Sequence, residues 1–397
     1  MWAGRHVVLG VSGGIASYKS CFLARLLTEA GARVDVALTR SAAEFVRPVT
    51  FEALTGRPVL SSLWEKDGAL SHVRWGQHAD LIIVAPATAQ LIARMAQGLA
   101  DDALTALLLA STAPIVLAPA MNDEMFAHPQ TQANLARLRD RGICIVGPES
   151  GALAEGPSDR PGRMSEPATI MAHAARRLAR GGPLDGKRVV VTAGPTREPI
   201  DPVRVVTNRS SGKMGFRIAE VAWQRGADVL LIAGPVGLET PAGVAVERIE
   251  TTAQMEQAVA AALPTTDVLV MAAAPADFRP ASPTRTKQPR SAGPLQLALE
   301  PTRDILQATL GARKPGSLMV GFALETGDAE SRGRTKLERK QLDLVVVNDA
   351  LEPGAGFEVD TNRVTLLDRL GERVVVPLQD KRAVAGAILD EVERLLG

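Results

Sequence analysis

Residues able to bind anions follow the first apolar run of this 397-residue sequence. The stretch GVSGGIASYK (10–19) places Ser12, Gly13 and Gly14 between that run and a helix-forming segment. Glycines at such a turn let backbone N–H groups approach an anion at the N-terminus of the helix. The stretch lacks the GxGxxG pattern of dinucleotide sites, and an ordinary tight turn also fits it. The residues therefore leave a phosphate site and a plain turn as alternatives.

Further small and polar residues follow the next apolar runs of the first half. They are Thr39 and Ser41 in LTRSA, Pro86, Ala87 and Thr88 in APATAQ, and Met121 and Asn122 in PAMNDEM. The carboxyl ends of parallel strands meet at one edge of a sheet, where ligands bind, so we expect these residues to lie together. Asn122 has an alternative role, because an asparagine directly after a strand also suits the N-cap of the next helix.

The histidines and cysteines do not indicate a metal site. None of the five histidines pairs at metal-ligand spacing, and Cys21 and Cys144 are isolated from each other. His72 stands out because it precedes the apolar run that leads to Thr88. A structural or surface role for a lone histidine competes with a catalytic one.

The most distinctive stretch of the second half is TAGPTREPIDPVRVVTNRSSGKMG (192–215). It follows an apolar run and carries Arg204, Asn208 and Lys213. The Walker A pattern GxxxxGK[ST] does not fit SSGKMG, so a P-loop is excluded. Cations beside glycine-freed N–H groups still favour recognition of a phosphate or a carboxylate.

Later runs of the second half end in a further group of candidates. Asp277 follows one run and Phe322 lies at the end of another. Lys336 and Lys340 are one helical turn apart and share a face. That face is either a solvated basic surface or a binding site for a triphosphate.

Short β-branched runs alternate with helix-forming segments throughout. The predicted strands cover 6–11, 33–38, 81–85, 114–119 and 143–148, then 188–194, 228–234, 267–274, 318–323 and 342–348. Helices are predicted over 16–31 and 89–111, and an antiparallel edge hairpin over 363–377. This order predicts an α/β protein with two doubly wound domains in series. The domains are placed at 1–180 and 188–397, with a Gly/Pro-bearing linker at 181–187.

Composition narrows the class of protein. With 45 Lys and Arg against 44 Asp and Glu, the chain has no large basic face, so nucleic acid is not an expected partner. Two cysteines cannot form a disulfide framework, which fits a reducing cytoplasm. No apolar run reaches about 18 residues, so no membrane span is expected. We therefore expect a cytoplasmic protein that binds small molecules.

Taken in order, these motifs resemble a known family, the bacterial fused flavoproteins of coenzyme A biosynthesis. In that family phosphopantothenoylcysteine decarboxylase is joined to phosphopantothenate–cysteine ligase. GVSGGIASYK, SHV, APATA, PAMN and PGRM resemble the decarboxylase half. TAGPTREPIDPVR, SSGKMG, GFALET, the Lys336–Lys340 pair and GFEVDTN resemble the ligase half. The resemblance covers the whole chain.

The resemblance implies a flavodoxin/Rossmann-like, FMN-binding decarboxylase domain in the first half. The cofactor-binding residues would be Ser12, Gly13, Gly14, Thr39, Ser41, Pro86, Ala87 and Thr88. His72 would be the active-site histidine, Asn122 would bind the substrate carboxylate, and Met121 and Arg163 would also contact substrate. Flavin oxidation of the cysteinyl unit to a thioaldehyde lets the carboxylate leave as CO₂, and the hydride return that follows needs an acid.

The same resemblance implies a CTP-dependent, Rossmann-like ligase in the second half. It would activate 4′-phosphopantothenate as an acyl-cytidylate, release pyrophosphate and then admit cysteine, with Mg²⁺ neutralising the triphosphate. Asn208 would hold the acyl intermediate and Arg204 and Lys213 would bind substrate. CTP would be held by Asp277, Phe322, Lys336 and Lys340. Homo-oligomers built from trimers of the first domain and dimers of the second are implied as well.

Two departures from the family pattern are visible. The family carries a cysteine as proton donor in the loop before PGRM, where this chain has Glu155, while Cys144 comes too early. Glu155 could serve if a closed flap desolvates it and raises its pKa. The ligase lysine run is replaced by RTKQ, so Arg285 or Lys287 takes the catalytic place, and we assign it to Lys287.

Two other functions are alternatives to the bifunctional enzyme. Without the loop cysteine, the first half could be a binding or regulatory module attached to an active ligase. An NAD-dependent oxidoreductase fails, because no GxGxxG is followed by an acidic residue about 20 positions on. The bifunctional enzyme is the prediction.

Overall fold

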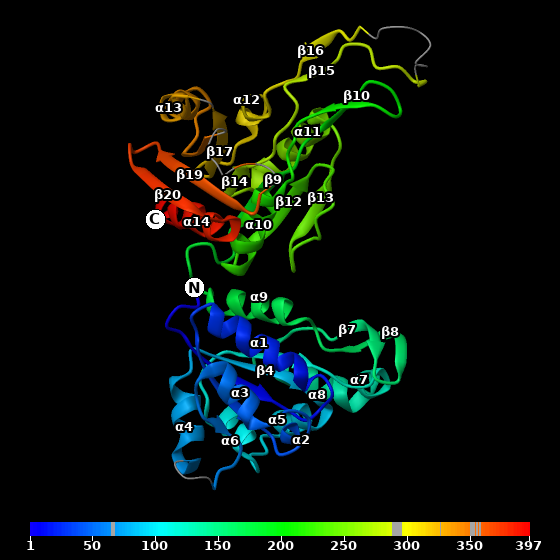
Figure 1. The fold of residues 1–397 in the computed structure, drawn as a ribbon, viewed down its shortest axis with the longest axis vertical. Coiled ribbons are helices and arrows are strands. Elements are labelled where there is room, and N and C mark those ends of the chain that lie inside the picture. Colours follow the sequence, from blue (N-terminus) through cyan, green and yellow to red (C-terminus); the bar gives the residue numbers. More distant parts are fainter. Residues whose placement is uncertain (65–67, 288–295, 326, 350–353, 355, 357–358) are drawn as a thin grey trace. The chain divides into compact units, whose positions relative to one another are not determined.

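The computed structural model describes residues 1–397 except 65–67, 288–295, 326, 350–353, 355 and 357–358. The chain divides into two compact units, Met1–Arg180 and Gly181–Gly397, both drawn in Figure 1. Residues 181–187, expected as a linker, belong to the second unit. There Leu184 is fully buried and the Gly186 N–H donates to the Gly226 carbonyl at 3.2 Å.

The first unit is built on a six-stranded parallel sheet in the order β3-β2-β1-β4-β5-β6. Its strands are β1 (His6–Val11), β2 (Arg33–Leu38), β3 (Val59–Leu60), β4 (Leu81–Ala87), β5 (Ile115–Pro119) and β6 (Cys144–Ile145). Val7 and Leu9 enter one core cluster and Val8 the other, because alternate side chains point to opposite faces. Both faces are covered, which explains the unbroken apolar runs. The strand order reverses between β1 and β4, the expected ligand-binding point of such a sheet.

Helices and one hairpin complete the first unit. The helices are α1 (Ser17–Glu29), α2 (Ala42–Phe45), α3 (Pro48–Thr55), α4 (Gly68–His78), α5 (Ala89–Gln97), α6 (Ala103–Ala110), α7 (Asp123–Ala127), α8 (Pro129–Asp140) and α9 (Pro167–Leu178). The hairpin pairs β7 (Glu149–Leu153) with β8 (Gly156–Arg163). The single helix predicted over 89–111 is wrong. Gly98 ends α5 in the left-handed region at φ 74°, and Asp102 starts α6 with a capping box.

The second unit contains an eight-stranded mixed sheet in the order β13-β12-β9-β14-β17-β18-β19-β20. Its strands are β9 (Arg188–Ala193), β12 (Asp228–Ala233), β13 (Ala245–Arg248), β14 (Val268–Met271), β17 (Leu318–Glu325), β18 (Leu344–Asp349), β19 (Thr361–Asp368) and β20 (Arg373–Asp380). The strands are parallel up to β18, and β19 and β20 form the predicted antiparallel edge hairpin. The prediction of two α/β domains is confirmed.

Helices and two small sheets surround this second sheet. The helices are α10 (Lys213–Gln224), α11 (Thr252–Ala262), α12 (Ile305–Thr309), α13 (Ala329–Arg339) and α14 (Lys381–Leu396), with short 3₁₀ turns at Leu263–Thr265 and Leu310–Ala312. One small sheet pairs β10 (Arg197–Pro199) with β11 (Val205–Thr207), and the other pairs β15 (Phe278–Pro280) with β16 (Leu299–Pro301). Within the described part of the chain, no helix is long and apolar enough to cross a bilayer.

Candidate active sites

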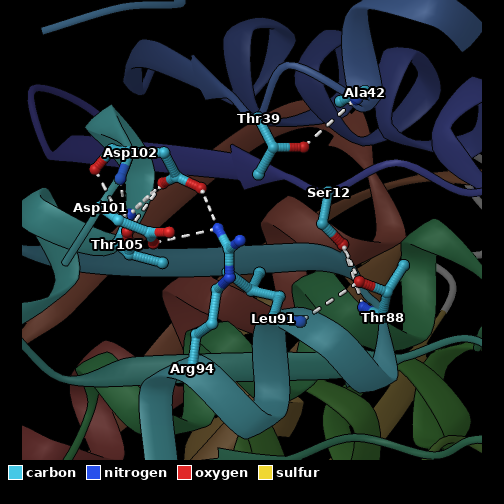
Figure 2. A network of polar contacts seen from close by, with 9 residues as sticks. All are labelled: Ser12, Thr39, Ala42, Thr88, Leu91, Arg94, Asp101, Asp102 and Thr105. Carbon is cyan, nitrogen blue, oxygen red and sulfur yellow. Dashed lines mark hydrogen bonds and ion pairs between the residues drawn. The ribbon is translucent and has the colours of Figure 1, made fainter. Parts of the chain in front are cut away.

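The turn after β1 and the turn after β4 are joined by hydrogen bonds of Ser12. Its hydroxyl donates to the Pro86 carbonyl at 2.8 Å and to Thr88 Oγ1 at 3.2 Å, and the Thr88 N–H donates back to Ser12 Oγ at 3.0 Å. Figure 2 shows Ser12 and Thr88 facing each other at this edge of the sheet. Thr88 also caps α5, since its Oγ1 accepts from the Leu91 N–H at 3.4 Å. The neighbouring strands β1 and β4 thus bring together two of the three predicted cofactor-binding segments.

The third segment, after β2, approaches the same point through a glycine contact. A Cβ added to Gly13 would lie 2.3 Å from Ser41 Cβ and 2.6 Å from the Ser41 carbonyl carbon, so only glycine fits there. Thr39 Oγ1 accepts from the Ala42 N–H at 3.2 Å and shapes this turn (Figure 2). Gly14 has more room, with Thr88 Cγ2 at 3.6 Å from a Cβ at that position. The three turns therefore form a narrow, hydroxyl-lined edge beside the N-terminus of α1.

Asn122 is the N-cap of α7, as the structural alternative predicted. Its Oδ1 accepts from the N–H groups of Glu124 at 2.9 Å and Met125 at 3.4 Å. This use of the carbonyl oxygen fixes the orientation of the side chain. The amide is half-buried, and its Nδ2 points away from the cap. Capping and substrate binding are therefore compatible roles for the two ends of one amide.

The β7–β8 hairpin packs against the same α7 region. The Met121 N–H donates to the Gly162 carbonyl at 3.0 Å, and the Ser158 hydroxyl donates to Asp123 at 2.6 Å. A Cβ on Gly162 would lie 2.6 Å from the Met121 carbonyl oxygen, so the close approach requires glycine. The PGRM and PAMN motifs are thus parts of one local structure.

Residues of the hairpin differ in their surroundings. Glu155 lies in the turn of the hairpin and is exposed in this chain. Arg163 pairs with Glu166, which also binds Lys19 Nζ at 2.9 Å. Cys144 lies inside β6, as predicted, and burial raises the pKa of its thiol. Cys144 therefore lies outside the β7–β8 hairpin, where the family places its cysteine.

His72 lies on α4 and is half-buried. Its Nδ1 is buried and has no hydrogen-bond partner among the residues that the structure describes. A buried polar atom without a partner costs free energy, which makes it a candidate for contact with a ligand. The purely structural alternative does not explain this atom.

In the second unit, a pocket of about 530 Å³ opens at the carboxyl edge of the sheet. Six of the predicted ligase residues line it: Asn208, Lys213, Asp277, Phe322, Lys336 and Lys340. The first and last of them, Asn208 and Lys340, are more than 100 residues apart in the sequence. The segments that carry them meet because β9, β14 and β17 are neighbours in the sheet. Among the described residues, no three His, Cys, Asp or Glu side chains form a metal-binding group.

Asn208 is fixed against the turn that follows β14. Its Nδ2 donates to the carbonyls of Ala274 at 3.3 Å and Pro275 at 3.0 Å. The amide nitrogen is thus used by the protein, and Asn208 lines the pocket. A fixed amide of this kind can orient a bound acyl group.

A buried polar network supports the same turn from behind. Glu198 accepts from the N–H and the hydroxyl of Thr252 at 2.8 and 2.9 Å. Thr252 contacts Thr196 at 2.9 Å, and Thr196 Oγ1 accepts from the Ala276 N–H at 2.9 Å. The TREP motif therefore acts beneath the pocket, where it positions the turn that carries Asp277.

The two predicted lysines are held by different partners. Lys336 Nζ donates to the Phe322 carbonyl at 2.6 Å, and its pKa is lowered by burial and then by the charge of Lys340. Lys340 pairs with Asp304 at 2.8 Å. Burial opposes ionisation of Asp304, but the hydrogen bond from Lys340 holds its pKa below the usual value. Both lysines are half-buried and line the pocket, so a fully solvated basic face is excluded.

Comparison with known proteins covers both units. Residues 1–179 match the family model "Flavoprotein", and residues 184–396 match "DNA/pantothenate metabolism flavoprotein C-terminal domain". The "Coenzyme A biosynthesis bifunctional protein CoaBC" of Bacillus subtilis (strain 168) is 45% identical over 396 residues, covering 98% of this chain and 97% of that protein. The protein of the same name from Mycobacterium bovis is 47% identical over 407 residues, covering 99% and 97%.

This chain belongs to the CoaBC family. It is a bifunctional enzyme of coenzyme A biosynthesis, a phosphopantothenoylcysteine decarboxylase and a phosphopantothenate–cysteine ligase, as the motifs predicted. The match to bifunctional relatives over nearly all of the chain does not support the binding-module alternative for the first half. Among solved structures, the "C-terminal Domain of Coenzyme A biosynthesis bifunctional protein CoaBC" is 40% identical, covers 54% of this chain and 98% of that chain, and has a TM-score of 0.47.

Two residues predicted for the CoaBC ligase site lie outside the pocket lining. Arg204 Nε donates to Asp201 at 2.8 Å, and the guanidinium lowers the pKa of that carboxyl to about 2. Lys287 and the alternative Arg285 are exposed. Arg204, Lys287 and the alternative Arg285 are therefore not among the residues that line the pocket. The roles proposed for them remain predictions.

Sequence reasoning missed four charged residues of the pocket, Arg209, Arg303, Asp304 and Lys381. Asp304 is the N-cap of α12, and the pattern of an aspartate before an apolar helix could have placed it. Lys381 is the first residue of α14 and is buried. A lysine at a helix N-terminus opposes the helix dipole, which was the available signal that it serves another purpose.

Proposed function

We propose that the two activities are divided between the domains at 1–180 and 188–397, on either side of the segment 181–187. In the first, FMN is the cofactor. The narrow edge formed by the turns after β1, β2 and β4 supports this proposal, because Gly13 leaves no room for a side chain and hydroxyls surround it. Backbone N–H groups at Gly13 and Gly14, with Ser12 and Thr88, would hold the flavin phosphate.

The decarboxylase residues would act around the substrate. FMN supplies the oxidation of the cysteinyl unit that makes loss of CO₂ possible. The Nδ2 group of Asn122 donates to the departing carboxylate while its Oδ1 stays in the α7 cap. His72 offers its Nδ1, which has no partner among the described residues. Arg163, at the end of β8, and Met121, which contacts the neighbouring Gly162, would meet the substrate at the base of the hairpin. Glu155, in the hairpin turn, is proposed as the acid of the final step.

In the second unit, CTP and 4′-phosphopantothenate would share the pocket of about 530 Å³. Lys336, Lys340 and Lys213 offset the triphosphate charge, and Asp277 and Phe322 contact the nucleotide. The substrate carboxylate attacks the α-phosphorus and pyrophosphate leaves. Asn208 then orients the acyl-cytidylate until the cysteine amine displaces CMP. Mg²⁺ would bind mainly to the triphosphate oxygens, as it does in many nucleotide sites.

Other assignments in this proposal rest on the family resemblance. They are Arg204 as a substrate ligand, Lys287 or Arg285 as the helper of cysteine attack, and an assembly built from trimers of the first domain and dimers of the second. The substrates are 4′-phosphopantothenate, cysteine and CTP.

The observation that carries the ligase proposal is the convergence of six predicted residues on one pocket. The experiment supplies the full chain with 4′-phosphopantothenate, cysteine and CTP, and follows pyrophosphate and CO₂. We expect a yellow protein that releases both. Pyrophosphate without CO₂ would refute the proposed decarboxylase site, and the absence of pyrophosphate would refute the ligase pocket. ATP in place of CTP should give markedly slower release.

A further inference from the structure

Two helices of the second unit begin with a lysine beside the ligase pocket. Helices α10 and α14 pack against each other (Figure 1), and their first residues are Lys213 and Lys381. Both residues line the pocket. Lys213 has its place in the proposed function, whereas nothing above requires Lys381.

Lys381 is buried and its ammonium group binds main-chain carbonyls. Nζ donates to the Gly356 carbonyl at 2.8 Å and to the Val359 carbonyl at 2.5 Å. The Lys381 N–H donates to the Asp360 carbonyl at 2.9 Å. One residue thus holds Val359 and Asp360, which directly precede β19, and Gly356, which comes earlier in the chain. An ammonium donates more strongly to carbonyls than a neutral amine does.

Two residues near these contacts line the pocket. Gly356 lines it directly, and Asn362, two residues beyond Asp360, lines it as well and is buried. Asn362 is on β19, and its Nδ2 donates to Oδ1 of Asn348 on the neighbouring strand β18 at 3.5 Å. Displacement of Asp360 would therefore disturb Asn362, and displacement of Gly356 would change the pocket lining directly. We call Gly356 and Asn362 the wall of the pocket, and its position depends on Lys381.

The surrounding charges make this lysine sensitive to pH. Burial, and then the charge of Lys213 on α10, lower the pKa of Lys381 to about 8, while Asp360 opposes the shift. Lys213 in turn pairs with Asp360 at 2.7 Å. Because the pKa is lowered, the ammonium is present below about pH 8 and is lost as the pH rises through that value.

We propose that Lys381 is a positioning residue of the ligase pocket, which holds the wall carrying Gly356 and Asn362 in the conformation that binds the nucleotide. This inference rests on the proposed function of the pocket. It assigns to Lys381 no contact with the reacting atoms. The expected signature is a change in the KM for CTP with a much smaller change in kcat.

The test uses the full chain and the exchange of labelled pyrophosphate into CTP in the presence of 4′-phosphopantothenate. Cysteine is omitted, so its thiol does not titrate in the assay. In Lys381→Met, the KM for CTP should rise about tenfold, because two buried carbonyls lose their donor. Lys381→Arg keeps the charge and should restore most of the affinity. Lys314→Met is the control, since Lys314 Nζ likewise has a fixed partner, Asp267 at 2.6 Å, but lies outside the lining of this pocket.

The pH profile separates positioning from general stability. Between about pH 7 and 9 the KM of Lys381→Met should be high throughout, and the KM of the wild type should rise more steeply than that of Lys381→Arg. Burial also lowers the pKa of Lys336 in the same pocket, so a rise shared by the wild type and Lys381→Arg is assigned to that lysine. A Lys381→Met KM within twofold of wild type, or equal alkaline rises in the wild type and Lys381→Arg, would overturn the proposal. Lys340→Ala tests the proposed function of the pocket separately from the role of Lys381. If that variant leaves the exchange unchanged, the proposed function of the pocket fails, whatever Lys381 does.

Discussion

The contact at Gly13 leads to a quantitative prediction about flavin binding. A Cβ at this position would lie 2.3 Å from Ser41 Cβ and 2.6 Å from the Ser41 carbonyl carbon. Nonbonded carbon atoms rest at about 3.5 Å or more, so the turns after β1 and β2 must separate by about 1.2 Å in Gly13→Ala. Ser41 is not a flexible chain end, because the contact includes its main chain. Relief therefore requires movement of the backbone.

The expected cost follows from this separation. Overpacking of this kind costs about 1–3 kcal/mol. We expect this cost to destabilise the FMN-bound form of the protein, which lowers the affinity for FMN by about ten- to a hundredfold. Gly14→Ala is the matched control. Its added Cβ meets Thr88 Cγ2 at 3.6 Å, an ordinary contact, and its backbone does not need a positive φ.

The assay is the FMN content per chain after gel filtration, followed by titration of the stripped protein with FMN. Gly13→Ala should lose its yellow colour on dilution, whereas Gly14→Ala should retain it. Pyrophosphate release by the second unit should be unchanged in both variants, and the urea unfolding transition of the first unit should show that it is still folded. Retention of wild-type FMN affinity by Gly13→Ala would refute the reasoning, because the cofactor would then not depend on the narrow edge.

Three further predictions concern single side chains. Glu198→Ala leaves the buried Thr252 N–H without its acceptor. It should lower the unfolding free energy of the second unit by about 1–3 kcal/mol. Pyrophosphate release should therefore be lost at a lower urea concentration than in wild type. Lys340→Ala should raise the KM for CTP about tenfold, whereas Asp304→Asn, which removes the competing carboxylate but keeps an N-cap, should leave it equal or lower. An increase in Asp304→Asn would contradict competition for the lysine. Glu155→Gln should slow the reductive step of the decarboxylase and accumulate the oxidised enethiol, measured by mass spectrometry, and unchanged turnover would remove Glu155 from the mechanism.

Much of both sites could be predicted because parallel strands deliver their carboxyl ends to one edge. Ser12 and Thr88 are 76 residues apart in sequence, yet they follow adjacent strands and form a hydrogen bond. The same reasoning places Asn208 and Asp277 in one pocket. The polar residues that follow each apolar run therefore indicated which side chains lie together at the edge of the sheet.

Other features were not predicted from the sequence pattern. Lys381 directly follows β20, whose last residue, Asp380, pairs with Thr361 at the start of β19, so this lysine also lies at a strand end. It was missed because the predicted hairpin ended at residue 377. Arg204 is three residues from Asp201 and pairs with it locally, a short-range partner that could have been weighed. The exposure of Glu155 follows from its place in a hairpin turn, and the β7–β8 pairing was hidden by glycines and prolines.

The β7–β8 hairpin is fixed at one end and exposed at the other. Near its base, Gly162 packs directly on Met121, while the turn that holds Glu155 touches little of its own chain. A substitution in the turn can therefore exchange one acid for another without disturbing the contact between Gly162 and Met121. On the proposed assignment of Glu155 as the acid, such a hairpin allows the proton donor to be exchanged while the base keeps its geometry. It also gives the protein engineer a short segment in which new donors can be introduced by loop exchange.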